Sequence, residues 1–245
     1  MGSGTWVALS GALARLRELD AVAHNLANAD TVGFKRERVA FTAALASAVA
    51  DVGAGPARGA AGRVFPAFAP GGLDLASGPI AHTGAPLDVA IDGEGFFEIE
   101  TAAGPRYTRA GAFALAPDGT LVTMAGDPVR GEGGPITAPE GDARILPNGE
   151  VVDREGQSLG RLAIVRFADP SALVAEAGNL LRVEGDAAPE PVDDPRLVPG
   201  ALERSNVRSV EELASLVLLQ RAFDITIRAM QSDDDAPRRL IQEMS

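Results

Sequence analysis

The two ends of this chain share one spacing of mostly apolar residues, and the long segment between them follows another. Near the N-terminus these side chains recur three and four residues apart, at Leu9, Ala12, Leu16, Leu19, Ala23 and Leu26 (the N-terminal stripe). Near the C-terminus the same steps join Leu213, Leu216, Gln220, Phe223, Ile227 and Met230 (the C-terminal stripe). Such steps place side chains along one side of a helix, as at the a and d positions of a coiled coil. Both ends are therefore predicted to be helices that pack through these stripes.

The segment over residues 87–183 alternates apolar and polar side chains with the period of two that is typical of half-buried strands. Strands are expected at residues 87–91, 95–100, 106–109, 112–115, 120–123, 161–167 and 180–183. The segment 161–167 is the longest and is expected to be central. Asp118-Gly119 and Asn148-Gly149 are strong signals for tight hairpin turns. We expect a mostly antiparallel β domain of about ten short strands.

Glycine and proline crowd into the segments on both sides of this β region, as is typical of linkers and irregular arms. The pattern predicts an α+β fold in which a discontinuous domain of coiled-coil-like terminal helices carries an inserted, mostly antiparallel β domain. The predicted parts are the terminal-helix domain (1–35 with 201–245), a Gly/Pro-rich arm (36–86), the β domain (87–183) and a return linker (184–200).

The ends of the predicted helices have their own signals. The first helix is expected to stop near Asn28, with Gly33 placed for the turn that follows. The Ala-rich segment 41–50 is interpreted as a second, weaker helix. The C-terminal helix is expected to break or kink within residues 233–237, where three aspartates precede a proline.

The composition excludes several classes of function. The chain has 22 Lys and Arg against 34 Asp and Glu, a formal net charge of −12, which argues against a nucleic-acid partner and against docking on anionic lipid. It has no cysteine, so disulfides and thiolate metal sites are ruled out. No stretch approaches the roughly 20 apolar residues of a spanning helix, and no membrane insertion is expected. The first residues also lack the pattern of a standard secretory signal.

No motif for catalysis or cofactor binding stands out. The Gly-rich segments 53–55 and 131–134 lack the residues of a phosphate-binding loop. The only two histidines, His24 and His82, are interpreted as structural, and the acidic run 233–235 as a solvated helix end. We therefore predict a protein without catalytic, metal or cofactor-binding residues and without a small-molecule substrate.

The terminal helices are apolar on more than one side. Leu13 and Val22 lie off the N-terminal stripe, and Val217 and Leu218 lie off the C-terminal stripe. A helix that is apolar on several sides has several neighbours. Two helices cannot cover all of these faces, and other subunits are the expected neighbours.

Several segments, in order along nearly the whole chain, resemble the signatures of bacterial flagellar rod and hook proteins. They are VALSGA (7–12), LDAVAHNLAN (19–28), TVGFK (31–35), LDVAIDGEGFF (87–97), YTRAGAF (107–113), DGTLV (118–122), GALERSNV (200–207) and QRAFD (220–224). The resemblance implies a structural subunit of the basal-body rod that polymerises through its terminal helices, with the β domain outside, and transmits torque. Its implied partners are other axial rod proteins, further copies of itself and the flagellar type III export apparatus.

The resemblance also implies a location in the rod that spans the periplasm, with export that leaves no cleaved signal peptide. The length of the chain and its short Gly/Pro-rich arm are most similar to proximal rod subunits. A distal rod subunit is the alternative within the family. A soluble β-domain binding protein or enzyme with a helical stalk is the alternative from another class.

The assembly interface is expected on the two stripes and on the turn after the first helix. The expected interface residues are Leu9, Leu16, Leu19, Asn25, Leu26, Asn28, Gly33, Phe34, Leu213, Leu216, Gln220, Phe223, Ile227 and Met230.

Overall fold

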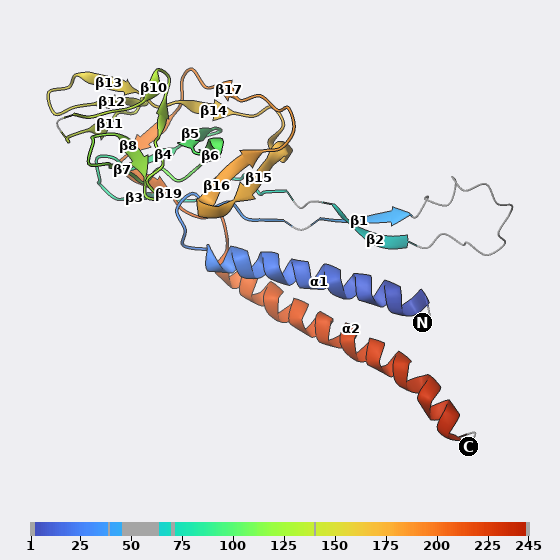
Figure 1. Ribbon diagram of the computed structural model, residues 1–245. Helices are drawn as coiled ribbons and strands as arrows, with labels where there is room; N and C mark the ends of the chain where they lie inside the picture. Colours follow the sequence, from blue (N-terminus) through green and yellow to red (C-terminus); the bar gives the residue numbers. More distant parts are fainter. Residues whose placement is uncertain (1–2, 39, 46–63, 70–71, 140, 244–245) are drawn as a thin grey trace, which may run out of the picture. The chain divides into compact units, whose positions relative to one another are not determined.

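The chain folds into two compact units that alternate along the sequence. The computed structural model describes residues 3–38, 40–45, 64–69, 72–139 and 141–243 (Figure 1). The helical unit comprises Met1–Leu26, Glu37–Gly71 and Arg208–Ser245. The β unit comprises Ala27–Arg36 and Gly72–Val207. The chain therefore passes from one unit to the other four times.

Two long helices and a hairpin make up the described part of the helical unit. They are α1 (Ser3–Ala27), α2 (Ser209–Glu243), β1 (Ala40–Leu45) and β2 (Val64–Ala69). The expectation of a helix at each end is confirmed. Coiled-coil packing between α1 and α2 is not confirmed, because the described residues show no extended contact between them.

The helix expected over residues 41–50 is wrong for its first half. Residues 41–45 belong to β1, which pairs with β2 in antiparallel register so that Leu45 lies opposite Val64. Residues 46–50 lie outside the described part of the chain. Helix propensity is a weak preference, and pairing with β2 outweighs the propensity of the Ala-rich sequence.

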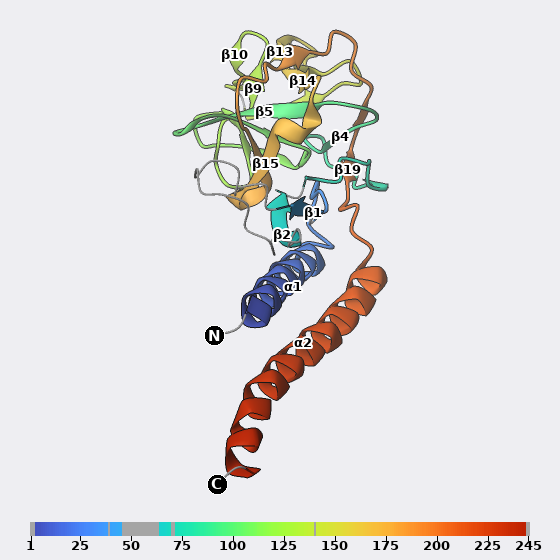
Figure 2. The same cartoon turned by 90° about the vertical axis from the view of Figure 1, so that its right-hand side faces the viewer.

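The break expected in the C-terminal helix is also absent. Figure 2 shows α2 as one helix to its end, and its residues run without interruption through Asp233 and Pro237 to Glu243. A proline removes one helical hydrogen bond and crowds the preceding turn, which a long helix can absorb as a bend without ending.

The β unit contains short strands and two 3₁₀ turns, Pro170–Ala172 and Ala177–Asn179. Its strands are β3 (Ile80–His82), β4 (Val89–Ile91), β5 (Phe96–Thr101), β6 (Gly104–Thr108), β7 (Phe113–Leu115), β8 (Leu121–Thr123), β9 (Arg130–Gly131), β10 (Gly134–Pro135), β11 (Arg144–Ile145), β12 (Glu150–Val152), β13 (Ser158–Arg161), β14 (Ile164–Arg166), β15 (Leu173–Glu176), β16 (Leu180–Val183), β17 (Glu190–Pro191), β18 (Leu197–Pro199) and β19 (Ala201–Glu203).

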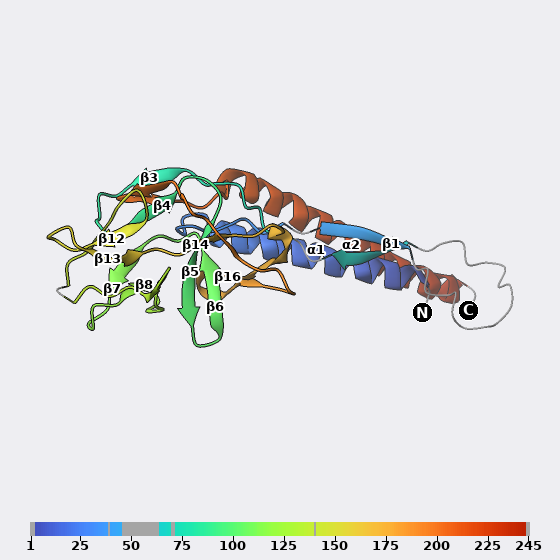
Figure 3. The same cartoon turned by 90° about the horizontal axis from the view of Figure 1, so that it is seen from above.

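Every named strand pair is antiparallel, which confirms the expected sheet type. The largest sheet has the order β15-β16-β6-β5-β14-β17, and Figure 3 shows its β5–β6 hairpin clearly. A second sheet has the order β11-β12-β13, and the other strands form isolated pairs. Two of these pairs, β3 with β19 and β4 with β18, join the first strands of the unit to its last.

The single central strand expected over residues 161–167 is wrong. The structure divides it into β13, which ends at Arg161, and β14, which begins at Ile164 and lies next to the edge of its sheet. The two strands are separate because the backbone N–H groups of the two residues between them donate hydrogen bonds to other parts of the β unit. Leu162 N–H donates to Gly149 O at 2.9 Å, and Ala163 N–H donates to Arg130 O at 3.0 Å.

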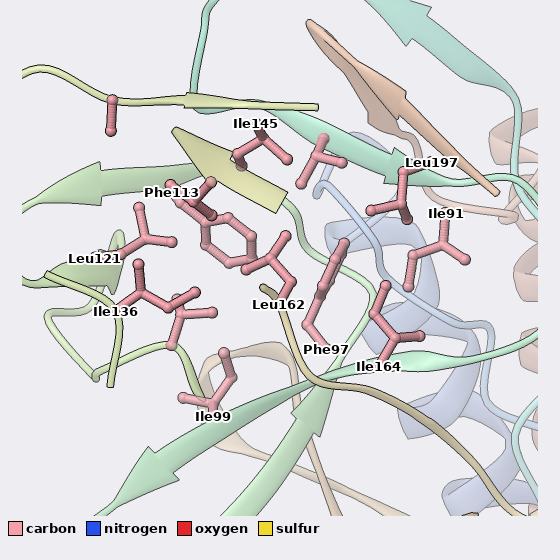
Figure 4. Packing of buried hydrophobic residues seen from close by; sticks show 14 of the residues in the cluster. Ile91, Phe97, Ile99, Phe113, Leu121, Ile136, Ile145, Leu162, Ile164 and Leu197 are labelled. Carbon is pink, nitrogen blue, oxygen red and sulfur yellow. The ribbon is translucent and has the colours of Figure 1, made fainter. Parts of the chain in front are cut away.

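Two hydrophobic clusters fill the β unit, one on each side of β5. Phe97 and Ile99 point into the larger cluster, in which the Phe97 and Phe113 rings meet edge to face with centroids 5.2 Å apart (Figure 4). Their neighbour Phe96 lies in the smaller cluster with Tyr107. Because successive side chains of a strand face opposite ways, two adjacent phenylalanines supply both clusters.

Gly111 lies where two backbones approach too closely for a side chain. A Cβ atom there would lie 1.7 Å from the Val89 carbonyl oxygen. Gly111→Ala is therefore expected to lower the free energy of unfolding by about 1–3 kcal/mol or more, measured by urea unfolding. Gly133→Ala is the matched control, because a Cβ atom there meets nothing within 4 Å. Equal stability of the two variants would contradict the close approach.

Candidate assembly interface

One half of α2 carries five exposed apolar side chains among exposed charged ones. Val210 is 80% exposed, Leu218 65% and Ile225 68%, and Leu213 and Val217 are also exposed. At about 3.6 residues per turn, these five positions fall within one half of the helix circumference. Large exposed apolar patches on a soluble protein mark places where another molecule binds.

The opposite half of α2 is covered. Glu212 and Leu219 are buried, and Phe223 and Ile227 are half-buried. The two halves of α2 therefore have different environments. Among the described residues, the rest of the chain covers one half and leaves the apolar side chains of the other half exposed.

Exposed leucines also mark α1. Leu13 is 51% exposed and Leu16 45%. Ala14 and Val22 are buried on the other half of the helix, and Ala12, which lies close to Leu16 around the helix, is buried too. Leu13 lies off the N-terminal stripe, so the stripe alone does not define the exposed apolar surface.

The expected interface residues fall into four groups. Exposed are Leu16, Leu213 and Gln220, and half-buried are Leu19, Leu26, Asn28, Leu216, Phe223 and Ile227. Buried are Asn25, Gly33 and Phe34. The side chains of Leu9 and Met230 lie outside the described ones, although their backbones belong to α1 and α2. The exposed positions that the stripes missed are Leu13, Val210, Val217, Leu218 and Ile225.

Asn25 and Asn28 bond to backbone and side chains near the end of α1. The Asn25 side chain donates to the Glu37 carbonyl oxygen at 3.0 Å and accepts from the Glu37 N–H at 2.8 Å. The Thr31 hydroxyl donates to the Asn28 side-chain oxygen at 3.0 Å. The structure thus gives both asparagines a role in holding the chain that leaves the helix.

Gly33 occupies a position that only glycine fits. Its φ of 68° lies in the left-handed region, and a Cβ atom would lie 2.3 Å from the Ala110 nitrogen. Its N–H donates to the Glu203 carbonyl oxygen at 2.7 Å. The turn after α1 is thereby fixed against the last strand of the β unit.

A buried cluster of charges lies beside this turn. The Lys35 ammonium approaches Glu203 Oε1 at 2.7 Å, and Arg109 Nη1 approaches Glu203 Oε2 at 3.2 Å. The three side chains are 2%, 4% and 1% exposed for Lys35, Arg109 and Glu203. Two cations therefore share one carboxylate away from water, an arrangement that requires further acceptors. We call these three residues the charge cluster.

Backbone carbonyls supply these acceptors. Lys35 donates to Ala76 O at 2.8 Å, and Arg109 donates to Gly93 O at 2.6 Å. Burial lowers the pKa of Lys35 from its ordinary value, while the Glu203 carboxylate acts in the opposite direction. Burial lowers the pKa of Arg109 in the same way. Removal of Glu203 would leave both cations without their only charged partner in the cluster.

Sequence reasoning missed the charge cluster. Lys35, Arg109 and Glu203 lie within segments that resemble family signatures, but Glu203 is 168 residues from Lys35 and 94 from Arg109. No local spacing links residues so far apart. The available signal was the presence of charged residues within otherwise apolar or small-residue segments.

The described residues include no group of three or more His, Asp or Glu side chains arranged to hold a metal ion. Among the described helices, none is both long and apolar enough to cross a membrane.

Comparison with known families gives three matches along the chain. Residues 7–35 match the flagella basal body rod protein family, and residues 90–157 match the D1 domain of the flagellar hook protein FlgE/F/G family. Residues 198–243 match the C-terminal family of the flagellar basal body rod FlgEFG proteins. The three matches include α1, part of the β unit and α2.

Curated relatives match over nearly their full length. The chain is 34% identical to the flagellar basal-body rod protein FlgF of Caulobacter vibrioides over 250 residues, covering 100% of this chain and 98% of that protein. It is 33% identical to FlgF of Rhizobium meliloti over 253 residues, with the same two coverages. It is 35% identical to FlgG of Bacillus subtilis over 247 residues, covering 91% of this chain and 92% of that protein.

Proposed function

The chain belongs to the family of flagellar basal-body rod proteins, which are structural proteins and not enzymes, and from that premise we propose that it polymerises through α1 and α2 and transmits torque. Membership of this family makes it a structural component of the flagellar basal body that assembles with other axial proteins. The proposal adds which surfaces bind neighbouring subunits and what the polymer does.

The exposed apolar side chains of α2 carry the proposal. Val210, Leu218 and Ile225 are more than half exposed, although full burial of such a side chain stabilises a protein by about 1.5–3 kcal/mol. A neighbouring helix in a polymer would cover these side chains together with Leu213 and Val217. The leucines of α1 give the same unit a second apolar surface for a different neighbour.

The proposed neighbours are further copies of this chain and other axial proteins of the rod. The proposed interface keeps the exposed stripe residues Leu16, Leu213 and Gln220 and adds the exposed residues that the stripes missed. Asn25, Gly33 and Phe34 support it from within the chain. We further propose delivery by the flagellar type III export apparatus, without cleavage of a signal peptide, into the rod that spans the periplasm.

Within the rod, we propose the role of an FlgF-type, proximal subunit. The FlgF relatives of Caulobacter vibrioides and Rhizobium meliloti align with all of this chain. The FlgG of Bacillus subtilis aligns with less of it at similar identity, which keeps an FlgG-type, distal subunit as the alternative.

Leu213→Asp tests the proposed polymerisation. Leu213 is 49% exposed in the single chain, so a carboxylate there costs little before assembly. At a helix–helix contact between subunits the same carboxylate would be buried without a partner, which an interface does not tolerate. The expected result is a folded, exported protein that forms no rods, seen by electron microscopy of basal bodies and by loss of swimming.

Met124→Asp is the matched control, because Met124 is an exposed apolar residue of the β unit at 77% exposure. Rods and swimming are expected to persist in this variant. Normal basal bodies with Leu213→Asp would refute the role of α2. Unfolding of the single chain by Leu213→Asp would show instead that this face belongs to the core of the protein.

A further inference from the structure

The four passages of the chain between the units begin or end in three short segments of the β unit. Residues 27–36 leave α1 and lead to β1, residues 72–78 return from β2, and residues 203–207 lead to α2. Any force that the covalent chain carries between the units must pass through these three segments.

Asn206 joins all three segments. Its side-chain oxygen accepts from the Arg36 N–H at 2.8 Å. Its side-chain nitrogen donates to the carbonyl oxygens of Asp74 at 2.7 Å and Ala76 at 3.0 Å. The Asp74 N–H in turn donates to the Arg36 carbonyl oxygen at 2.8 Å. The side-chain amide of Asn206 therefore holds the segment 203–207 against the segments 27–36 and 72–78.

The charge cluster joins the same segments a second time. Glu203 lies in the segment 203–207 and Lys35 in the segment 27–36, and both bond to the segment 72–78. Lys35 donates to Ala76 O, and Glu203 Oε1 accepts from the Gly78 N–H at 2.8 Å. Arg109 then connects Glu203 to the carbonyl oxygens of Ile91, the last residue of β4 and part of the larger hydrophobic cluster, and of Gly93 just after that strand.

We propose that the charge cluster and Asn206 form a clamp that carries mechanical force between the covalent connections and the core of the β unit. This inference rests on the proposed function, because it concerns how a rod subunit carries load. Apolar contacts are non-directional and allow neighbouring segments to slide. Buried charges with fixed hydrogen-bond partners hold one register, and separating them exposes uncompensated charge at low dielectric.

Lys35→Met tests the clamp while sparing the core. The variant removes one of two cations that share one carboxylate, and it replaces a buried ammonium with an apolar chain of similar length. Glu203 retains Arg109 and the Gly78 N–H as partners. Asn206→Ala opens the same clamp without changing a buried charge and serves as a second variant.

Hydrogen exchange of the full chain gives the first measurement. The amides of Gly33, Arg36, Asp74 and Gly78 are expected to exchange about tenfold or more faster in Lys35→Met, the size expected for losing a hydrogen bond to a charged group. Arg130→Met is the matched control, because it removes a partly exposed ion pair with Glu98 in the β unit, outside the three segments. Unchanged exchange at the four amides would overturn the clamp.

Swimming under load gives the second measurement. Cells with Lys35→Met are expected to form rods and to swim in dilute medium, but to stop at a lower viscosity than cells with Arg130→Met. Equal swimming of the two strains at every viscosity would overturn the force-carrying role, even with faster exchange. Absence of rods with a folded Lys35→Met chain would also overturn it, since the cluster would then serve assembly. The Leu213→Asp result is independent of all three outcomes.

Discussion

Glu203→Gln is expected to lower the free energy of unfolding of the β unit by about 3–5 kcal/mol. Glu203 is 1% exposed and is the only carboxylate paired with Lys35 and Arg109 in the charge cluster. Glutamine keeps the volume and one acceptor oxygen, but it leaves two buried cations without the anion that pairs with both of them. Denaturant unfolding followed by the fluorescence of Tyr107, the only tyrosine of the chain and part of the β unit, measures the loss.

Two further variants separate charge from volume. Glu190→Gln removes one side of an exposed ion pair with Arg166 and is expected to cost less than about 1 kcal/mol. Adding Lys35→Met to Glu203→Gln is expected to recover part of the stability, because one of the two uncompensated cations is removed. Equal losses for Glu190→Gln and Glu203→Gln would show that burial of the cluster does not matter.

Phe97→Ala is expected to cost the β unit about 3–5 kcal/mol of unfolding free energy. The side chain is 0% exposed in the larger hydrophobic cluster and lies against the Phe113 ring. Truncation would remove its contacts and leave a cavity whose walls are held by strands on several sides. Denaturant unfolding monitored at Tyr107, which lies in the other cluster, would show whether the whole unit loses stability.

Phe97→Leu is the control for Phe97→Ala. It keeps most of the side-chain volume and is expected to lower the free energy of unfolding clearly less. Hydrogen exchange should accelerate at core amides such as those of Leu121 and Val129, which bond within the β unit. A loss below about 1 kcal/mol for Phe97→Ala would place Phe97 outside the core.

The parts of the fold that the sequence predicted well are those set by local patterns. The period of two located β5 and β16 to within a residue or two, because apolar and polar side chains alternate along much of each strand. The steps of three and four located both helices, because burial of one helix face follows the same geometry at every turn. In each case the signal lies within about ten neighbouring residues.

The parts that the sequence missed depend on distant partners. β1 is Ala-rich and is a strand because it pairs with β2, which begins 19 residues after β1 ends. The charge cluster depends on three segments that meet only in the folded chain. On the helices, the stripes identified apolar positions but not their exposure, because exposure depends on what covers each face. Leu218 was expected on a second apolar side of the helix, but Ile225 became visible only in the structure.

The pairing of first strands with last strands sets an order of events for folding. Residues 80–82 in β3 pair with residues 201–203 in β19, and β4 pairs with β18 just inside them. A chain that emerges from its N-terminus cannot complete these pairs until about five-sixths of its length is available. Contacts between such distant residues close slowly, because a long loop loses conformational entropy when its ends meet. The β unit therefore completes its fold late. The residues of α1 emerge long before the β unit that follows them can finish folding.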